Sequence, residues 1–509
     1  MKNKWDIFTI ILSIIITIIW VIILFYFYND KNPENKIEEK IADNIINNID
    51  KNKTDKNLET WKKDQIKNYK YATNLEFWSW NIVEIDLEAR EVELELIPWI
   101  KTRMNSYNKW NKLEPLVIRA KKGDKIVVNF KNSLSEETTV HWHWVRVPNS
   151  QDWVPWVTQD PIPAWWVYNY TFVVNDPWTF LFHPHKNHSE QIGRWLYWIL
   201  IVEDEKEPKY DKEFAWVLKD YRIWNDWKLT DDFWNMMDKT HGWRIWNLLT
   251  INNIINKTVE VNPWDTIRLR LANMSNARIY NLDLKKFDLK VIATDDGIIN
   301  NPKKVDELEM WPWERYDLEI KIPEELENLK LIDNFFKRET PNRLATMKIV
   351  WKQIADKEIK TPIWELPDWR SAKYNKPDII IDLGWMWVMW WDKRMMMWAW
   401  AERGWTINDG IFPKTNKPIK LKKWKMYIIR MVNKSRRDHP MHLHWDFFQV
   451  VNVNWTKWEF IGWKDTINVK PMQYIDVAIL PTNAWKWAFH CHILEHADLG
   501  MFTTIDIED

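Results

Sequence analysis

The pattern of hydrophobic and polar positions divides the 509-residue chain into an apolar run near its start, a polar stretch, and a long region of short alternating segments. Residues 7–28 are uncharged and apolar, and this run is long enough to cross a bilayer as one helix. Lys2 and Lys4 precede the run and no small-residue cleavage site follows it. We therefore expect residues 1–30 to form a transmembrane anchor or signal, with an uncleaved anchor favoured, and the polar residues 31–72 to form a tether.

From about residue 75 the chain consists of short β-rich runs separated by turn residues, and few stretches have a helical period. This pattern predicts an all-β sandwich or barrel architecture. One segment recurs three times, beginning at Lys121, Asn262 and Lys422. Each copy has a turn, then an alternating strand, then an asparagine nine positions after the turn residue: Asn132, Asn273 and Asn433. Three copies predict three similar β domains, which we place at residues 73–205, 206–365 and 366–509.

The composition is unusual in two residue types, because the chain has 42 tryptophans and only 9 glycines. Glycine is usually about 7% of a chain, which would be roughly 36 residues here. Tryptophan also stands where turns require glycine: the turn residue of the repeat is Gly123 in the first copy but Trp264 and Trp424 in the others. Only glycine takes a positive φ cheaply in such turns. We hypothesise that most of these tryptophans are glycines encoded by UGA, as in bacterial lineages that read UGA as glycine.

Charge and cysteine content exclude several classes of function. The 72 basic and 72 acidic residues leave no net charge, and no basic run is present, so nothing in the charge pattern favours a nucleic-acid partner. The single cysteine, Cys491, excludes an internal disulfide framework and a thiolate cluster.

Ten of the 12 histidines fall in four tight clusters. Two clusters lie in the first predicted domain and two in the third, and each contains an H-x-H pair: His141/His143, His183/His185, His442/His444 and His490/His492. At the corresponding place the second repeat has Leu282-Asp283-Leu284. On a strand, an H-x-H pair points both imidazoles to one face. Four pairs from two domains can therefore supply eight imidazoles to a shared interface, and imidazole is a ligand that suits copper.

The last cluster also contains the only thiol. Cys491 is the middle residue of its H-x-H pair and therefore points to the opposite face of the strand. A His₂Cys set with a weak axial methionine is the blue-copper arrangement. His439, Cys491, His496 and Met501 supply such a set. One short peptide thus predicts a thiolate-bound copper beside the interface imidazoles.

These motifs resemble those of the three-domain multicopper oxidases, the laccase and cuprous-oxidase family, and the resemblance covers about residues 75–509. It implies three cupredoxin-like Greek-key domains and four copper ions: one type 1, one type 2 and two type 3. By this resemblance type 2 copper is held by His141 and His442, and type 1 copper by His439, Cys491, His496 and Met501. The two type 3 ions are held by His143, His183 and His492, and by His185, His444 and His490.

The resemblance also implies roles for residues that are not ligands. Asp152 matches the acid that supplies protons for oxygen reduction, whereas Ala497 replaces a second acid that some relatives carry. His188 and His241 match no copper motif. The family has glycine at the positions of Trp144, Trp153, Trp156 and Trp445, and tryptophan at those of Trp142 and Trp487.

A methionine-rich segment bears on the identity of the electron donor. Between Gly384 and Gly404 the chain contains Met386, Met389, Met395, Met396 and Met397, and we expect a mobile loop there. Thioether ligands favour Cu(I), and related cuprous oxidases carry such insertions near type 1 copper. Packing is the alternative role of these methionines.

Three functions remain open. The first is an oxidase in copper homeostasis that uses O₂ and takes electrons from Cu(I) or from a small phenol-type donor. The second is a non-catalytic, membrane-tethered assembly protein of the same fold, and the third a copper-sequestering protein. The full ligand set favours the oxidase. A copper nitrite reductase fits the three repeats less well. By resemblance, the active site faces away from the cytoplasm, tethered to the membrane through residues 7–28.

Overall fold

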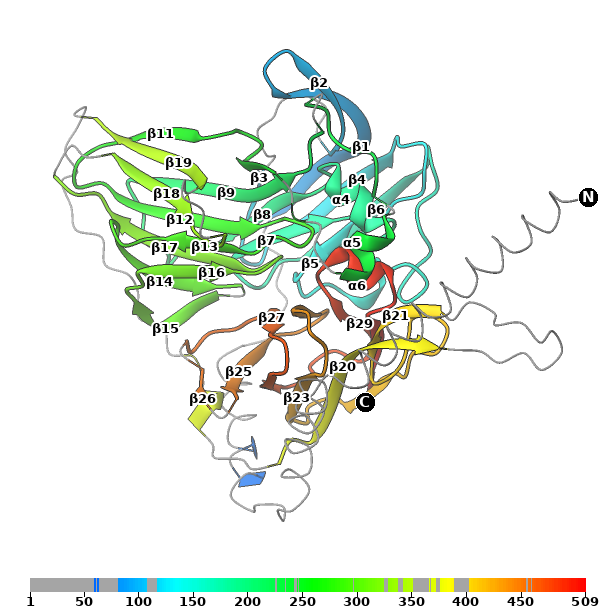
Figure 1. Ribbon diagram of the computed structural model, residues 1–509. Coiled ribbons are helices and arrows are strands. Elements are labelled where there is room, and N and C mark those ends of the chain that lie inside the picture. The colour runs from blue at the N-terminus through cyan, green and yellow to red at the C-terminus, as the bar shows by residue number, and fades with distance from the viewer. Residues whose placement is uncertain are drawn as a thin grey trace, which may run out of the picture. The chain divides into compact units, whose positions relative to one another are not determined.

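The computed structural model of this protein describes most of residues 81–509 and a short piece before them. The described residues are 59–60, 62–63, 81–107, 117–224, 227–233, 235–241, 245, 247–295, 297–324, 328–336, 342–350, 366, 368–371, 376–388, 402–454, 456–458 and 460–509. All of them belong to one compact unit, Asp55–Asp509. Within it the strands form six sheets, two in each of three consecutive stretches of chain (Figure 1).

The first stretch builds two four-stranded sheets. One has the order β2-β1-β4-β6, with β1 (Ile82–Ile97), β2 (Ile100–Ser106), β4 (Lys125–Asn132) and β6 (Val167–Val173). The other has the order β3-β8-β7-β5, with β3 (Val117–Lys121), β5 (His141–His143), β7 (Thr179–His183) and β8 (Trp198–Glu203).

The second stretch builds a six-stranded and a five-stranded sheet. The larger has the order β10-β9-β12-β17-β14-β15, with β9 (Lys212–Tyr221), β10 (Leu248–Ile251), β12 (Thr266–Asn273), β14 (Asp288–Thr294), β15 (Gly297–Lys303) and β17 (Arg315–Lys321). The smaller has the order β11-β19-β18-β13-β16, with β11 (Lys257–Val261), β13 (Tyr280–Asp283), β16 (Glu307–Met310), β18 (Leu329–Asp333) and β19 (Asn342–Ile349).

The third stretch repeats this plan. One sheet has the order β21-β20-β23-β28-β25-β26, with β20 (Ile379–Val388), β21 (Glu402–Ile407), β23 (Tyr427–Asn433), β25 (Phe448–Val453), β26 (Thr456–Lys457) and β28 (Tyr474–Ile479). The other has the order β22-β30-β29-β24-β27, with β22 (Ile419–Lys422), β24 (His439–Leu443), β27 (Thr466–Val469), β29 (Trp485–Cys491) and β30 (Phe502–Glu508). The prediction of an all-β protein is therefore confirmed.

Helices are few and short in the described part of the chain. Within residues 81–509 the described α-helices are α4 (His188–Gly193), α5 (Met236–His241) and α6 (Leu494–Asp498), and the 3₁₀ turns are η1 (Asn149–Gln151) and η2 (Trp369–Ser371); residues 59–60 and 62–63 are helical as well. Helix α6 packs against both α4 and α5, and the three gather in one place (Figure 1). None of these helices is long and apolar enough to span a membrane. The predicted anchor at residues 7–28 and most of the predicted tether at residues 31–72 lie outside the described residues. Within the tether, Lys62 is described: it is buried and pairs with Asp378 at 2.6 Å, so this part of the tether packs against the third stretch.

The threefold repeat has a structural explanation. Its alternating strands become β4, β12 and β23, and its asparagines end these strands with fully buried side chains. In each copy the asparagine Nδ2 donates to backbone carbonyls of the following loop and of a more distant segment. Its Oδ1 accepts from the backbone N–H two residues on: Leu134, Ser275 and Ser435. One side chain thus closes the loop after the strand in each of the three copies.

The turn residues of the repeats all have positive φ, at 91° for Gly123, 67° for Trp264 and 60° for Trp424. Among the described residues twelve tryptophans share this conformation: Trp99, Trp144, Trp153, Trp156, Trp165, Trp195, Trp227, Trp264, Trp313, Trp424, Trp445 and Trp485. This set includes the four tryptophans that the resemblance places at glycine positions, and neither Trp142 nor Trp487 belongs to it. Positive φ is unfavourable for any bulky side chain.

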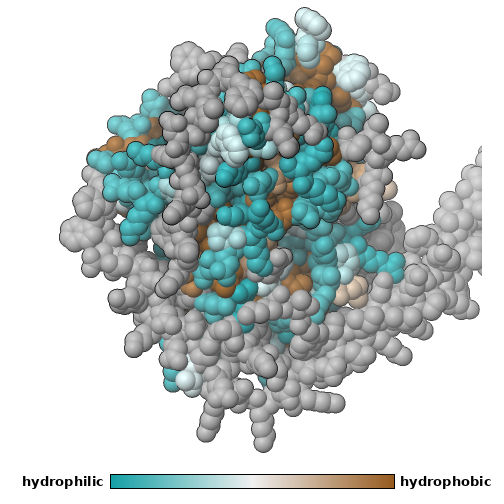
Figure 2. Space-filling view, turned by 90° about the vertical axis from the view of Figure 1, so that its left-hand side faces the viewer, coloured by the Kyte–Doolittle hydropathy of each residue, from teal (hydrophilic) through white to brown (hydrophobic). Residues whose placement is uncertain are grey.

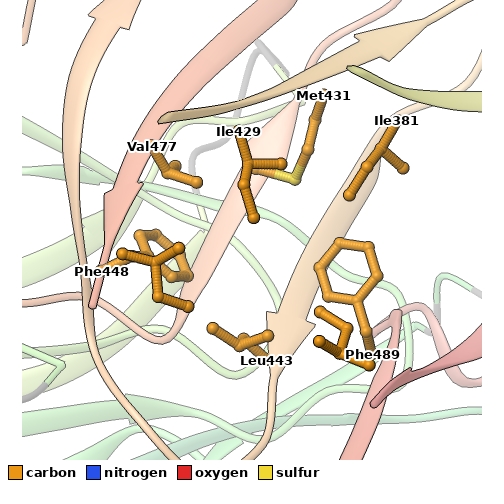
Figure 3. A pocket seen from close by; sticks show the side chains of 9 residues that line it. Ile381, Ile429, Met431, Leu443, Phe448, Val477 and Phe489 are labelled. Atoms are coloured by element: carbon orange, nitrogen blue, oxygen red, sulfur yellow. The ribbon is translucent and has the colours of Figure 1, made fainter. Parts of the chain in front are cut away.

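The packed interior of the third stretch is apolar, and one face of the molecule is mostly hydrophilic. In the third stretch, side chains from both sheets point toward one another around a small apolar space, lined by residues such as Ile429, Leu443, Val477 and Phe489 (Figure 3). Because this lining has no polar group, the space is part of the packed core. On the face shown in Figure 2, the described residues are mostly hydrophilic, with hydrophobic residues scattered among them. Neither feature suggests a binding site, so the histidine clusters remain the candidate.

Candidate metal centre

Neighbouring strands place the four H-x-H pairs side by side. In the first stretch β5 pairs antiparallel with β7, and His141 lies opposite His183. In the third stretch β24 pairs antiparallel with β29, and His442 lies opposite His490. Each ladder therefore brings two clusters together. Contacts such as His141 with His444, whose ring centroids are 4.1 Å apart, join the two stretches into one site.

The structure brings the eight paired histidines together in overlapping groups of three. Within each group the candidate ligand atoms all lie within 4.8 Å of one another. These groups include His141, His143 and His442; His143, His183 and His492; His185, His444 and His490; and His442, His490 and His492. All eight side chains are buried. Two of these groups are the sets predicted for the two type 3 ions, and a third contains the pair predicted for type 2 copper.

The ring nitrogens have the arrangement that a metal ion requires. Nε2 of His490 lies 3.2 Å from Nε2 of His185 and 3.1 Å from Nε2 of His444, so three nitrogens converge on one place. Nε2 of His141, Nε2 of His442 and both nitrogens of His492 are buried and have no hydrogen-bond partner within the described part of the chain. Buried polar atoms are rarely left unpaired in proteins. Converging, unpaired imidazole nitrogens therefore fit copper, which prefers such ligands.

Protonation does not compete with this use of the imidazoles at neutral pH. Burial is the largest cause that lowers the pKa of nine clustered histidines, to about 4 for His444 and about 3 for His439. For the remaining seven the pKa falls well below its usual value: His143, His183, His185, His442, His490, His492 and His496. These rings are neutral and keep a lone pair for a metal.

Asp152 contacts two of the predicted ligands. Its carboxylate lies 3.2 Å from Nδ1 of His141 and 3.0 Å from Nδ1 of His444, and its backbone carbonyl accepts from Nδ1 of His141 at 2.9 Å. Burial would raise the pKa of Asp152, but His444 and His141 outweigh it and hold this pKa well below its usual value. The ionised carboxylate fixes the tautomers so that Nε2 of each ring is free to bind a metal.

Sequence reasoning missed a second carboxylate at the site, that of Asp465. Its side chain is completely buried and lies 3.8 Å both from Nε2 of His143 and from Nδ1 of His442. Its backbone carbonyl lies 3.3 Å from the same Nδ1 of His442. No motif marks Asp465, which lies 23 residues beyond His442, and the only signal is that β27 pairs with β24.

The third stretch also forms the predicted thiolate group. Sγ of Cys491 lies 3.8 Å from Nδ1 of His439 and 3.6 Å from Nδ1 of His496, and these two nitrogens are 3.2 Å apart. Burial raises the pKa of the Cys491 thiol, so the thiol is protonated when no metal is present. Met501 is fully buried, and its backbone carbonyl accepts from the N–H of Cys491 at 3.0 Å. The trio and its methionine neighbour therefore form a second, separate candidate site.

The remaining predicted residues are placed only in part. The segment from Gly384 to Gly404 is not a loop throughout, because β20 continues to Val388 and β21 begins at Glu402. The two strands pair as far as Val388 opposite Glu402, so both strands extend into the segment that the sequence predicted to be a loop. The backbone of Met386 lies in β20, whereas Met389, Met395, Met396 and Met397 lie outside the described residues. His188 is buried beside Asp498, at 3.4 Å, and is not a member of the ligand groups named above.

Comparisons with known proteins agree with this geometry. Two family models, both described as multicopper oxidase, match residues 103–207 and 391–509. The multicopper oxidase mco of Staphylococcus haemolyticus is 29% identical over 406 residues, covering 77% of this chain and 81% of that protein. A multicopper oxidase structure from Pseudomonas thermotolerans matches with a TM-score of 0.71 and 26% identity, covering 84% of this chain and 99% of that one. One from Campylobacter jejuni, titled a metallo-oxidase, matches with a TM-score of 0.71 and 25% identity, covering 84% and 92%.

Proposed function

We propose that this chain, which matches two multicopper oxidase family models and relatives of that name, is an oxidoreductase of this family that takes electrons from Cu(I) and passes them to O₂. When bound, copper would supply the one-electron oxidation of the donor and the four-electron reduction of O₂ to water. The observation that carries the proposal is the meeting of ten buried histidines and Cys491 in two adjacent sites. Non-catalytic copper binding is the alternative, and oxygen uptake distinguishes it.

We propose four copper ions on these residues. His439, Cys491 and His496 would hold type 1 copper, with the buried Met501 as a further, weak ligand. His141 and His442 hold type 2 copper, and the two remaining groups hold the type 3 pair: His143, His183 and His492, and His185, His444 and His490. Cys491 stands between His490 and His492 in sequence, so three consecutive residues provide ligands to both proposed sites. This gives electrons a short covalent route from the thiolate site to the imidazole site.

The chain's own groups orient the ligands and exclude water. Asp152 holds Nδ1 of His141 and of His444, and the carbonyl of Pro184 holds Nδ1 of His183 at 2.9 Å. Because all of these groups are buried, bulk water is kept away from the imidazoles. We also propose that the Asp152 carboxylate passes protons toward the site when O₂ is reduced.

The proposal of Cu(I) as donor rests on the β20–β21 hairpin. The N–H of Trp405 in β21 donates to the carbonyl of Leu499 at 3.1 Å, and Leu499 directly follows α6, which carries His496. The ring of Trp405 lies 4.1 Å from that of His496. Residues 389–401, with four of the methionines, connect these two strands. We propose that the methionines of this connection supply soft thioether ligands that deliver Cu(I) to the thiolate site.

The location of the enzyme is also a proposal. The apolar run at residues 7–28 favours a membrane anchor, with the copper sites on the extracytoplasmic face. A polar tether of about 40 residues would then separate the oxidase from the membrane.

We further propose that the tryptophans with positive φ are glycines in the natural protein. Four of them, Trp144, Trp153, Trp313 and Trp445, also bury an indole N–H that has no hydrogen-bond partner among the described residues. A bulky ring in an unfavourable backbone conformation and an unpaired buried donor are two independent costs, and glycine removes both.

The function is tested by oxygen uptake of the copper-loaded full-length protein in detergent, with Cu(I) and with a phenol as donors. We expect faster uptake with Cu(I), and a selective loss of it when Met389, Met395, Met396 and Met397 are all replaced by leucine. Leucine at Met236 and Met237, two exposed methionines on α5, is the matched control. Uptake with phenols alone would indicate a laccase-like enzyme. No uptake by protein that holds copper would leave binding or assembly as the function.

A further inference from the structure

The second stretch of the chain supplies none of the predicted copper ligands, yet one of its turns reaches the imidazole site. Residues 311–314 connect β16 to β17, and Arg315 follows as the first residue of β17. The Arg315 side chain is only 1% exposed, and that of Glu314 only 2%. A charged side chain is rarely buried this completely unless it has partners that hold it.

Arg315 contacts all three stretches of the chain. Its Nη2 pairs with Oδ2 of Asp465, which lies in the third stretch, just before β27. The same nitrogen donates to the carbonyl of Asp295 in the second stretch at 2.9 Å. Its Nε donates to the carbonyl of Thr179 in the first stretch at 3.3 Å, and Thr179 begins the strand that ends at His183. One guanidinium therefore joins β7, which ends at His183, to the residue just before β27, the strand that pairs with the His442 strand β24.

The carboxylate of Asp465 transmits this contact to the imidazoles. While Arg315 holds Oδ2, Oδ1 accepts from the Thr466 hydroxyl at 2.6 Å and faces His143 and His442 at 3.8 Å each. The Thr466 hydroxyl also lies 3.2 Å from Nδ1 of His442. A carboxylate fixed at both oxygens sets the position of a ligand ring and adds negative charge beside a bound cation.

A second buried cation supports the arrangement from the other side. Nζ of Lys464 lies 2.9 Å from Oδ2 of Asp295 and 3.1 Å from Oε1 of Glu314. Asp295 in turn accepts from the backbone N–H of Arg315 at 2.7 Å. Lys464, which precedes Asp465, thus forms an ion pair with Glu314, which precedes Arg315. This pair fixes the relative position of the two chain segments.

We propose that Arg315 is a positioning residue: through Asp465 it fixes His143 and His442, and so sets the affinity for type 2 copper, of which His442 is a proposed ligand. The second stretch, which has no H-x-H pair, completes the metal centre in this way. The inference rests on the proposed copper site. It adds Arg315 to that site as a residue that acts on the ligands through Asp465. Replacing a residue that positions a metal ligand typically lowers the metal affinity by about 10–100-fold.

The test is copper binding by the full-length protein, followed by two signals. The paramagnetic resonance signal of type 2 copper reports on His141 and His442, and the visible absorbance of the thiolate-bound copper reports on the separate site at Cys491. We expect R315M and D465N each to weaken type 2 copper binding by about 10–100-fold, with the thiolate signal retained. The double variant should bind no more weakly than either single variant, because both remove the same interaction. R315K should have intermediate affinity.

The matched control is R430M. The Arg430–Asp476 pair has the same side-chain exposure as the Arg315–Asp465 pair, 1% and 0%, and it joins β23 to β28, two strands that carry none of the proposed ligands. R430M should therefore keep the type 2 signal, even if it lowers stability.

Three results would overturn the inference. They are unchanged type 2 affinity in R315M, an equal loss of that affinity in R430M, and additive losses in the double variant. If R315M does not fold, the type 2 copper affinity of D465N and R315K is measured instead, and unchanged affinity in both would overturn the inference. Wild-type protein that binds no copper would overturn the proposed copper site and the inference with it, whereas loss of neither signal in any variant would overturn the inference alone.

Discussion

At the level of single residues, burial determines the state of Cys491 before copper arrives. Its thiol is not exposed, and burial raises its pKa, so almost no thiolate forms near neutral pH. Because the thiolate is the reactive form, we expect a thiol reagent to label Cys491 in the folded, copper-free protein far more slowly than in urea. Equal rates in the two states, followed by mass spectrometry, would show that the thiol is open to solvent.

Burial of the histidines predicts how the copper-free protein responds to acid. Because their pKa values are lowered, to about 4 for His444 and about 3 for His439, the unfolded chain binds more protons between pH 6.5 and 4. The stability that these rings contribute is therefore present above pH 6.5 and is lost as the pH falls toward 4, at up to about 1.4 kcal/mol per pH unit for each histidine. We expect the urea midpoint to fall steeply over this range. A midpoint that stays flat from pH 7 to pH 5 would contradict the lowered pKa values.

At the level of elements, the repeated asparagines link loop closure to the thiolate site. Asn273 and Asn433 make equivalent hydrogen bonds, but only the loop after Asn433 carries Ser435, whose hydroxyl lies 2.7 Å from Nε2 of His439. Replacing either asparagine by alanine leaves buried backbone groups unpaired and should cost about 1–3 kcal/mol for each. We expect N273A and N433A to lose comparable stability in urea titrations, whereas only N433A changes the absorbance of the thiolate-bound copper. The same spectral change in N273A would rule out a local effect.

Strands were predictable from the sequence where the pattern is local. The alternating repeat and the H-x-H pairs lie within single strands, so the sequence predicts the all-β fold, and the structure brings the predicted ligands together. Pairing between distant strands was not predictable in this way. Asp465 joins the site because β27 lies beside β24, and β21 extends to Glu402 because β20 supports it. Register of this kind depends on tertiary contacts, which no motif encodes.

At the level of the whole molecule, the imidazole site depends on all three stretches. The first and third supply the rings, and Arg315 of the second is bonded to both Thr179 and Asp465. The sequence showed that the second repeat lacks an H-x-H pair, but it could not show what replaces it, because a single arginine at the start of a strand has no recognisable pattern. A bound metal that bridges stretches of chain stabilises the folded state by mass action. Copper removal should therefore lower the unfolding temperature, which calorimetry of the two forms would measure.

The tryptophan content is also a property of the whole chain, because its costs add up. A bulky residue with positive φ costs about 1–3 kcal/mol, so twelve such residues rival the entire free energy of unfolding of a typical protein, about 5–15 kcal/mol. We therefore expect protein made with glycine at these twelve positions to fold and to bind copper, and protein made with tryptophan there to be largely insoluble. Tryptophan at Trp142 and Trp487, whose φ is not positive, is kept in both. Peptide masses of the natural protein provide the direct test: tryptophan at positions 264 and 424 would contradict the reassignment, and glycine at both would establish it there.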